Sequence, residues 1–425
     1  MSLFYDLIFF LIGIIYLPIY LFKGKFHKGF SSRLGILPDG LKLNRPIWLH
    51  AVSVGEAMAV KKLITELRRV FPDKRIAIST VTPTGNKIVR ELAKDSDYVF
   101  YLPLDFSFIV RRVVKKLNPS LFIAVETEFW PNLISRLYKE GIPTAIVNAR
   151  ISDSSFRGYS AGRIFIKAIL LKINLFLAQT NVDAQRLMAL GVSGKRIRTT
   201  GNMKFDNNPL AACGSGFNAG GMKAMLGLSD KDVLIVAGST HRGEEEIIVS
   251  AYKALLNKYP HLKLLIAPRH PERTPEVSDI IVKYGFKPLN ISELEKSGIS
   301  QAVPKGIFIL DTVGKLVSYY MLADIVFVGG SLVKKGGHNI IEPAVLGKAV
   351  LCCPHMFNFR DIYDLFVRNS ALITVHNGMQ LESEIEMLLS ASEDRSSLGR
   401  KAMEVVLQNQ GATVHNIKYI VEDLV

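Results

Sequence analysis

Short apolar runs alternate with amphipathic stretches along most of the chain. Continuous apolar runs are typical of strands buried on both faces of a parallel sheet, and the stretches between them predict covering helices. The strands expected in the first half are residues 47–52, 75–80, 98–103, 121–126, 144–149 and 175–180. Those expected in the second half are residues 233–239, 262–268, 307–310, 324–330 and 349–354. The pattern therefore predicts an α/β protein.

The alternation breaks near residue 200, where residues 206–223 are rich in Gly, Asn, Ala and Ser and predict a linker. Because 425 residues are too many for one ordinary core, we expect two domains. The first is residues 33–205, and the second is residues 224–425 with closing C-terminal helices. We expect two doubly wound, Rossmann-like domains that face a cleft, and in such sheets ligands bind at the carboxyl ends of the strands.

Residues 1–22 are almost wholly apolar and carry a single charge, Asp6. A span of roughly 20 apolar residues can cross a bilayer. A cleaved signal peptide is the alternative, but the segment lacks a basic start and a small-residue cleavage site. The cations that follow it predict that the rest of the chain stays on the cytoplasmic side, with those cations on anionic lipid. They are Lys23, Lys25, Lys28 and Arg33. We expect one membrane anchor, which either spans the bilayer or lies in one leaflet.

The formal charge of +15, from 53 basic and 38 acidic residues, favours an anionic partner. No basic strip is interleaved with aromatic residues, which argues against nucleic acid. The three cysteines, Cys213, Cys352 and Cys353, offer neither a disulfide framework nor a CxxC spacing. With no HExxH motif and no His/Cys cluster in the sequence, we expect no metal site.

The segment HAVSVGEAMAV (50–60) places Ser53 and Glu56 between a predicted strand and a predicted helix. The S-x-x-E spacing is that of a capping box, in which both side chains satisfy backbone N–H groups of the first helical turn. A carboxylate at the mouth of the predicted cleft can also act as a general base on a hydroxyl. Spacing does not separate the two interpretations.

Two further polar segments follow predicted strands of the first half. ETEFWP (126–131) carries Glu126 and Glu128 beside Trp130, a combination that suits either helix capping or sugar binding. NARIS (148–152) places Asn148 and Arg150 after the next strand. Both segments are candidates for a binding site at the predicted cleft.

Three segments of the second half predict anion binding. GSTHRGEEE (238–246) places Ser239 and its neighbours between a strand and a helix, where backbone N–H groups can bind an anion; its glutamates are expected to complement the helix dipole. APRHPER (267–273) carries Arg269 and His270, and the guanidinium of Arg269 can bind phosphate or lie free on the surface.

The third segment, GGSLVKKGGHNIIEPA (329–344), is the most informative. Its glycines predict a backbone cradle for a phosphate, with Lys334 on the loop. Glu342 can accept hydrogen bonds from a ribose diol. A glycine-rich turn with a capped helix is the structural alternative.

In joint order and spacing, these motifs resemble the 3-deoxy-D-manno-octulosonic acid (Kdo) transferases of lipopolysaccharide synthesis. The resemblance runs nearly end to end, through the anchor, WLHAVSVGE, ETEFWPN, NARIS, GNMKFD, GSTHRGEEE, APRHPER and GGSLVKKGGHNIIEPA. It implies a GT-B glycosyltransferase that moves Kdo from CMP-Kdo to a lipid A precursor, lipid IVA, at the cytoplasmic face of the inner membrane. It further implies an inverting reaction that needs neither metal nor cofactor, since CMP-Kdo is a substrate.

The resemblance also assigns roles to residues. Glu56 corresponds to the family's proposed base and Glu128 to its other important carboxylate. The donor residues implied by the family and the anion motifs are Ser239, Arg269, His270, Gly314, Ser331, Lys334, Gly337, Asn339 and Glu342. One departure is Lys315, which stands in DTVGKL where family members usually carry an acidic residue. It puts a side-chain role at that position in doubt.

Two other functions fit parts of the pattern. A GT-B enzyme that uses a UDP-sugar shares the length and the glycine-rich loop, but not the SVGE and ETEFWP segments. A membrane-bound nucleotide-binding module without catalysis is the second alternative, against which Glu56 and Glu128 argue.

Overall fold

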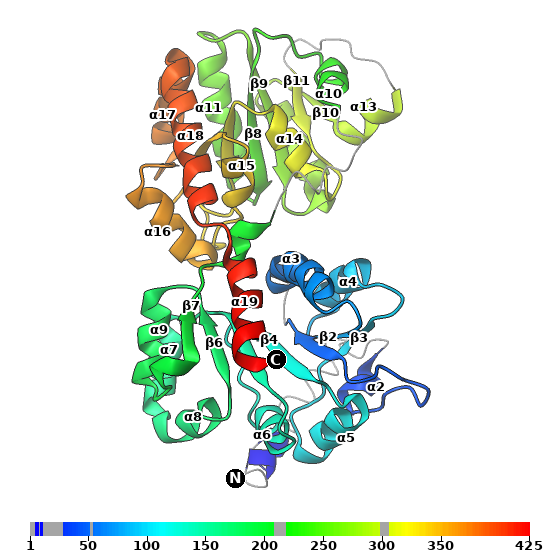
Figure 1. The fold of residues 1–425 in the computed structure, drawn as a ribbon. Helices are drawn as coiled ribbons and strands as arrows, with labels where there is room; N and C mark the ends of the chain where they lie inside the picture. The colour runs from blue at the N-terminus through cyan, green and yellow to red at the C-terminus, as the bar shows by residue number, and fades with distance from the viewer. Residues whose placement is uncertain (1–4, 8, 12–28, 52–53, 208–217, 298–305) are drawn as a thin grey trace. The chain divides into compact units, whose positions relative to one another are not determined.

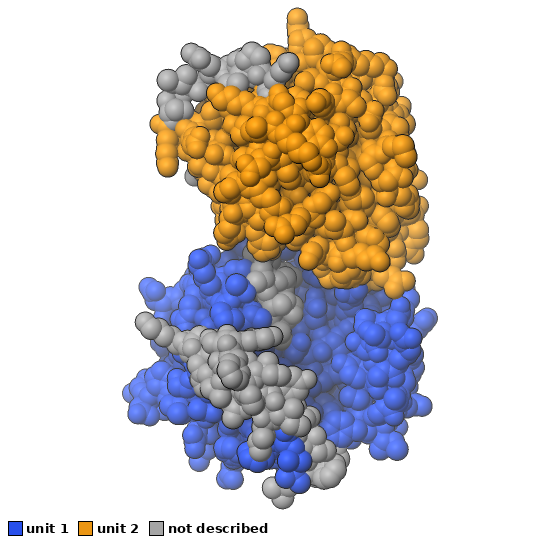
Figure 2. All heavy atoms as spheres, turned by 180° about the vertical axis from the view of Figure 1, so that it is seen from behind, with its two compact units in different colours: residues 1–207, 409–425 blue, residues 208–408 orange. Residues whose placement is uncertain are grey.

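The computed structural model describes residues 5–7, 9–11, 29–51, 54–207, 218–297 and 306–425, and it forms two compact units (Figure 1, Figure 2). Unit 1 comprises residues 1–207 and 409–425, and unit 2 comprises residues 208–408. Each unit contains a parallel sheet with helices on its faces, as the alternating pattern predicts. For residues 54–59 only the backbone, which lies in a helix, is described.

The sheet of unit 1 has the order β3-β2-β1-β4-β5-β6-β7, and every pair is parallel. Its strands are β1 (Ile47–His50), β2 (Ile76–Thr80), β3 (Tyr98–Tyr101), β4 (Leu121–Val125), β5 (Thr144–Ala149), β6 (Leu175–Ala178) and β7 (Ile197–Thr199). The chain first builds outward from β1 to β3 and then, from β4, outward to the opposite edge. The sheet therefore has its topological switch point between β1 and β4.

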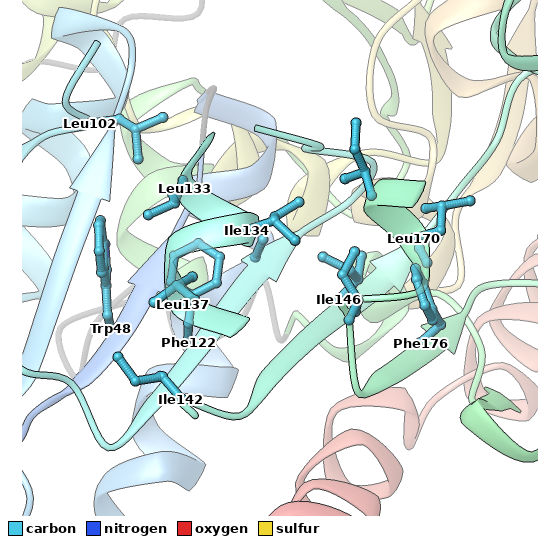
Figure 3. Close-up of a cluster of buried hydrophobic side chains, with 14 of the residues drawn as sticks. Trp48, Leu102, Phe122, Leu133, Ile134, Leu137, Ile142, Ile146, Leu170 and Phe176 are labelled. Carbon is cyan, nitrogen blue, oxygen red and sulfur yellow. The ribbon is translucent and has the colours of Figure 1, made fainter. Parts of the chain in front are cut away.

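The helices of unit 1 form a layer on each face of this sheet. They are α2 (Phe30–Arg33), α3 (Val54–Val70), α4 (Pro83–Leu92), α5 (Ser107–Leu117), α6 (Pro131–Lys139), α7 (Asp153–Ala161), α8 (Arg163–Leu170), α9 (Asn181–Ala189) and α19 (Ala412–Leu424). Apolar side chains of α5, α6 and α8 pack on the strand face that carries Trp48 and Phe122 (Figure 3). Those of α3 and α19 pack on the opposite face, which carries Ile47 and Leu49. Successive strand residues thus point into different cores, which explains why the strands are continuously apolar.

Unit 2 repeats the architecture with the parallel order β10-β11-β9-β8-β12-β13-β14. Its strands are β8 (Val233–Thr240), β9 (Leu262–Pro268), β10 (Lys287–Asn290), β11 (Gly306–Ile309), β12 (Ile325–Val328), β13 (Ala349–Cys352) and β14 (Ile373–Thr374). Its helices are α10 (Ala219–Met225), α11 (Glu244–Leu256), α12 (Thr274–Lys283), α13 (Ile291–Ser297), α14 (Leu316–Leu322), α15 (Ile341–Val345), α16 (Arg360–Arg368), α17 (Gly378–Ser390) and α18 (Ser392–Gln408). Here the switch point lies between β8 and β12.

The sequence pattern missed three strands, β7, β10 and β14. They are short edge strands that contain exposed or half-buried residues, so they lack the continuous apolar run of a strand covered on both faces. The eleven predicted strands are present, with ends that differ by a few residues.

The division of the chain differs from the predicted one at two places. The prediction put residues 224–425 in the second domain, whereas residues 409–425, with α19, belong to unit 1. Asp206 holds this helix: its carboxylate accepts the N–H groups of Gly411 at 2.6 Å and Thr413 at 2.5 Å. The predicted linker, residues 206–223, contains the start of α10, while residues 208–217 lie outside the described part of the chain.

Most of the predicted anchor, residues 1–22, also lies outside the described residues. The described part, residues 5–7 and 9–11, is helical and packs on unit 1. The carboxylate of Asp6 accepts hydrogen bonds from the N–H and hydroxyl of Ser107 and from the amide of Asn132. Among the residues that the structure describes, no helix combines the length and the apolar character needed to cross a bilayer. The anchor is therefore not confirmed.

Asp206→Ala is expected to lower the free energy of unfolding of unit 1 by about 2 kcal/mol, because it leaves two N–H groups at the start of α19 without their charged acceptor. Both tryptophans, Trp48 and Trp130, belong to unit 1, so tryptophan fluorescence in a denaturant titration reports this unit. Asp423→Ala is the control, because Asp423 lies on the same helix and its replacement removes only a surface ion pair with Arg198. Equal losses in both variants would contradict the capping role.

Candidate functional site

The motifs of unit 2 converge at its switch point. The segment GSTHRGEEE begins at the end of the central strand β8, and the segment that starts at Gly329 follows β12, which pairs directly with β8. Arg269 follows β9, the other neighbour of β8, and its N–H donates to the carbonyl of Thr240 at 2.9 Å. Parallel pairing thus brings three segments that are distant in sequence to one edge of the sheet.

Three histidines from these segments lie close together. The Nε2 atoms of His241 and His338 are 2.9 Å apart, and the two rings are nearly parallel, with an interplanar angle of 6°. The ring of His270 lies edge-on to His241, at 6.1 Å between centroids. One imidazole of the close pair donates its Nε2–H and the other accepts, so the pair is satisfied while both rings are neutral.

Burial and neighbouring cations keep these rings neutral. Burial, followed by the charge of Arg269, lowers the pKa of His338 to about 4. The pKa of His241 is also lowered, chiefly by burial and then by His270 and Lys335. An anion placed here would oppose both effects, because it stabilises the protonated imidazole.

Arg269, Asn339 and Glu342 lie near the His241–His338 pair. The side-chain amide of Asn339 donates to Glu342 Oε1 at 3.1 Å, and its carbonyl oxygen accepts the N–H of Ile341 at 3.1 Å. Burial raises the pKa of Glu342, while this hydrogen bond and the charge of Arg269 oppose the rise. Arg269 therefore lies near both Glu342 and His338, with its own side chain exposed to solvent.

The glycine-rich turn after β12 is organised differently from the phosphate cradle that its sequence predicts. The N–H groups of Gly330, Ser331 and Leu332 donate to the carboxylate of Glu244, at 2.8, 3.2 and 3.0 Å. The hydroxyl of Ser331 donates to the carbonyl of Val328 and accepts the N–H of Cys353. Ser331 is fully buried, and its polar groups serve the fold of the turn in this structure.

The remaining predicted donor residues occupy the surrounding loops. Ser239 is half-buried with a left-handed φ of 56°, and Gly314 is exposed in a turn after β11 with a φ of 89°. Lys334 and His270 are exposed, and Gly337 packs against Met356. Lys315 forms an ion pair with Glu295 at 2.7 Å, which gives the unusual residue of DTVGKL a structural role.

In unit 1 the two carboxylate motifs also meet at a switch point. Glu56 lies in the first turn of α3, which follows β1, and Glu126 and Glu128 follow β4, the strand that pairs with β1. The side chains of Ser53 and Glu56 lie outside the described residues, so the capping box and the base both stay predictions. Burial, followed by the negative charge of Glu128, raises the pKa of Tyr159.

Two residues at this edge have backbone conformations that are unusual for residues other than glycine. Glu126 has a φ of 60° and Asn148, at the end of the adjacent strand β5, has a φ of 54°. Asn148 Oδ1 accepts the N–H of Met203 at 2.9 Å, and Lys204 forms an ion pair with Glu126 at 3.4 Å. Left-handed conformations of such residues cluster at functional sites. The GNMKFD segment thus supplies a cation that the sequence analysis did not assign.

Glu244 was missed as a member of the site, because its run of glutamates was expected only to complement the helix dipole. Three of the four N–H groups that it accepts lie almost ninety residues away in sequence, so no local pattern indicates them. Within the described part of the chain, no group of three or more His, Cys, Asp or Glu side chains has a geometry that holds a metal ion.

A parallel α/β unit with cations and a buried carboxylate at its switch point is typical of proteins that bind nucleotides or nucleotide-sugars. A solved glycosyltransferase from Rickettsia africae shares the fold with a TM-score of 0.59, at 15% identity, over 90% of this chain and 99% of that one. The model of the 3-deoxy-D-manno-octulosonic-acid transferase (kdotransferase) family matches residues 28–207.

The curated relatives identify the family. A 3-deoxy-D-manno-octulosonic acid transferase of Haemophilus influenzae is 38% identical over 86% of this chain and 84% of its own length. A transferase of the same name from Aquifex aeolicus is 30% identical over 82% of this chain and 87% of its own length. The chain therefore belongs to the Kdo transferase family and is a glycosyltransferase.

The histidine pair predicts how the stability of unit 2 depends on pH. The folded pKa of His338, about 4, lies below the value of about 6.5 for an unfolded histidine. The unfolded chain therefore binds the proton more readily, and stability is lost as pH falls from about 6.5 toward 4. We expect His338 to contribute a slope of at most about 1.4 kcal/mol per pH unit, and His338→Gln to remove it.

Hydrogen exchange of the β8 and β12 amides between pH 7 and 5 measures this slope in unit 2 alone. His376→Gln is the control, because His376 is exposed and distant in sequence from the pair. A slope that is unchanged in His338→Gln would show that the ring does not resist protonation.

Proposed function

We propose that this protein transfers Kdo from CMP-Kdo to a phosphorylated lipid A precursor, lipid IVA, by an inverting reaction that needs no metal. The observation that carries the proposal is the convergence of Arg269, the His241–His338 pair and Glu342 at the switch point of unit 2. The names of the relatives support the choice of sugar. We infer the acceptor from the family resemblance and from the basic surface described below.

Unit 2 is the proposed donor side. A CMP-sugar carries a phosphate and Kdo carries a carboxylate, so the donor is anionic at two points. Arg269 can bind an oxyanion with its planar guanidinium, and His338 and His241 can donate hydrogen bonds to one. Glu342, held by Asn339, can accept hydrogen bonds from the ribose hydroxyls. As the donor breaks, these groups would stabilise the negative charge that grows on the departing CMP phosphate.

Unit 1 is the proposed source of the base. Glu56 would take the proton from the attacking sugar hydroxyl while the oxygen bonds to the anomeric carbon of Kdo. The bond from that carbon to the phosphate oxygen breaks in the same step, and CMP leaves with the electron pair. Attack from the face opposite the phosphate inverts the configuration. Glu128 would position the acceptor, together with Glu126 and Lys204, which form an ion pair.

Glu56→Gln is expected to keep CMP binding and to lose roughly 100- to 10,000-fold in transfer rate, because the amide cannot accept the proton. The assay is Kdo transfer from CMP-Kdo to a tetra-acylated lipid A precursor in the presence of a chelator. Glu66→Gln is the matched control, since Glu66 lies on the same helix and pairs with Arg69.

The same assay decides among the alternatives. A Glu56→Gln variant that keeps most of its rate would make Glu56 a helix cap and Glu128 the next candidate. A wild type that transfers nothing and binds UDP more tightly than CMP would favour a UDP-sugar enzyme. Binding of CMP without any turnover would favour the nucleotide-binding module.

We also propose that unit 1 contacts the cytoplasmic face of the inner membrane. A cavity of about 440 Å³ between α5 and α6 is lined by Arg111, Arg136 and Lys139, together with Ser107 and Phe108. Residues 5–7 and 9–11 lie beside it, since Asp6 accepts hydrogen bonds from Ser107, Tyr5 stacks on Phe165 and Phe9 packs on Phe106. Large apolar side chains of the same segments are exposed: Leu7, Phe10, Leu11, Phe108, Ile164 and Phe165. Cations beside exposed apolar residues suit a surface of anionic lipid.

Replacing Arg111 and Lys139 together by Ser is expected to weaken binding to anionic vesicles roughly 30-fold, at about 1 kcal/mol for each cation. Vesicle flotation of the full chain measures this, with neutral vesicles for comparison. The control is the Arg400→Ser, Lys401→Ser pair on the exposed face of α18 in unit 2. An equal loss in the control, or on neutral vesicles, would contradict a specific basic surface.

A further inference from the structure

We propose that Glu244 is a positioning residue of the donor site: its carboxylate replaces a substrate phosphate as the anion bound by the glycine-rich turn, and it holds His241 against His338. The inference rests on the proposed function, because it assigns the donor to this edge of unit 2. It also changes which groups are expected to bind the donor substrate: the backbone amides of the turn bind Glu244, so the side chains of the site bind the donor.

The carboxylate of Glu244 is surrounded by four backbone donors. Oε2 accepts the N–H of His241 at 2.9 Å and of Gly330 at 2.8 Å. Oε1 accepts the N–H of Leu332 at 3.0 Å and of Ser331 at 3.2 Å. The residue is fully buried, so these donors come entirely from the protein. Burial raises the pKa of Glu244, and the N–H groups of Gly330, His241 and Leu332 oppose the rise, because a protonated oxygen would face a donor.

The two glycines of the turn are required by this arrangement. A Cβ at Gly329 would lie 2.6 Å from the carbonyl oxygen of Ser239 and 2.9 Å from Glu244 Oε2. Gly330 has a left-handed φ of 69°, and a Cβ there would lie 3.0 Å from His338 Nε2. The Gly-Gly pair therefore serves the close approach of β12 to β8 and to the buried carboxylate.

The same carboxylate links the two halves of the histidine pair. His241 donates its N–H to Glu244, and the carbonyl of Gly330, in the turn that Glu244 binds, accepts the N–H of Gly337 beside His338. The neighbouring Glu245 also joins the end of β8 to the segment after β9. Its carboxylate accepts hydrogen bonds from the hydroxyl of Thr240 at 2.9 Å and from Arg273 at 2.7 Å. The imidazoles and Arg269 are thereby held in place before any ligand arrives, which reduces the ordering that donor binding requires.

The first test uses the wild-type full chain and hydrogen exchange of the turn, with and without CMP. If Glu244 is the bound anion, the amides of Gly330, Ser331 and Leu332 exchange slowly without ligand, and saturating CMP adds no further protection. Fast exchange in the free protein, with strong protection on adding CMP, would overturn the inference, because the amides would then be bound by the nucleotide phosphate. This test needs no variant and is independent of how Glu244 variants fold.

The second test compares Glu244→Gln and Glu244→Asp. Gln keeps the size but puts an NH₂ group against two N–H donors, whereas Asp keeps the charge. We expect Glu244→Gln to raise the CMP dissociation constant and the donor KM at least tenfold at a temperature where circular dichroism shows it folded. The acceptor KM should stay unchanged, and Glu244→Asp should recover part of the loss. Glu246→Gln is the matched control, because Glu246 is half-exposed on the same helix and pairs with Lys283.

The outcomes separate the inference from the proposed function. A Glu244→Gln protein with a lower melting temperature but wild-type CMP affinity would reduce Glu244 to a structural residue and overturn the inference alone. A wild type that does not bind CMP would overturn the donor assignment itself.

Discussion

Each central strand of both sheets is buried on its two faces and paired in parallel with its neighbours, so the chain must cross over a face of the sheet before it can add the next strand. All strands consequently point the same way, and their carboxyl ends share one edge. The order changes direction once in each sheet, between β1 and β4 and between β8 and β12. At those two points successive crossovers diverge, and the polar segments after the strands are left accessible to a ligand.

Buried carboxylates hold these edges together. Asp206 caps α19, Glu244 binds the turn after β12, and Asp105 accepts the N–H groups of Asn132 and Leu133 at the start of α6. Each accepts backbone N–H groups that are distant from the carboxylate in sequence and that secondary structure leaves unpaired. Because an unpaired buried N–H is costly, such a carboxylate can determine how a whole loop folds. Burial raises the pKa of Glu244, and that of Asp105 to about 7, although the N–H groups that these carboxylates accept oppose the rise.

In the site of unit 2, a buried carboxylate lies close to side chains that can donate hydrogen bonds to a ligand, one of them charged and the others neutral. Glu244 lies behind the turn, while Arg269 is exposed and the His241–His338 pair is kept neutral by burial and by nearby cations. The neutral pair can donate a hydrogen bond without the cost of burying a full charge in the free protein. An incoming anion would favour protonation of the pair, which couples ligand charge to the proton content of the site.

The sequence by itself determined the α/β class, the central strands, the motifs at their ends and the family, because continuous apolar runs and ordered motifs are local features of the chain. Only the tertiary structure decided the strand order, and with it which motifs are neighbours. It also showed that α19 returns to unit 1, that Lys204 pairs with Glu126, and that the amides of the glycine-rich turn bind Glu244. These contacts join residues separated by tens to hundreds of positions, and no local pattern encodes which of several carboxylates or cations a distant backbone group will meet. The turn sequence predicted a phosphate cradle, whereas in the structure the N–H groups of the turn donate to the carboxylate of Glu244.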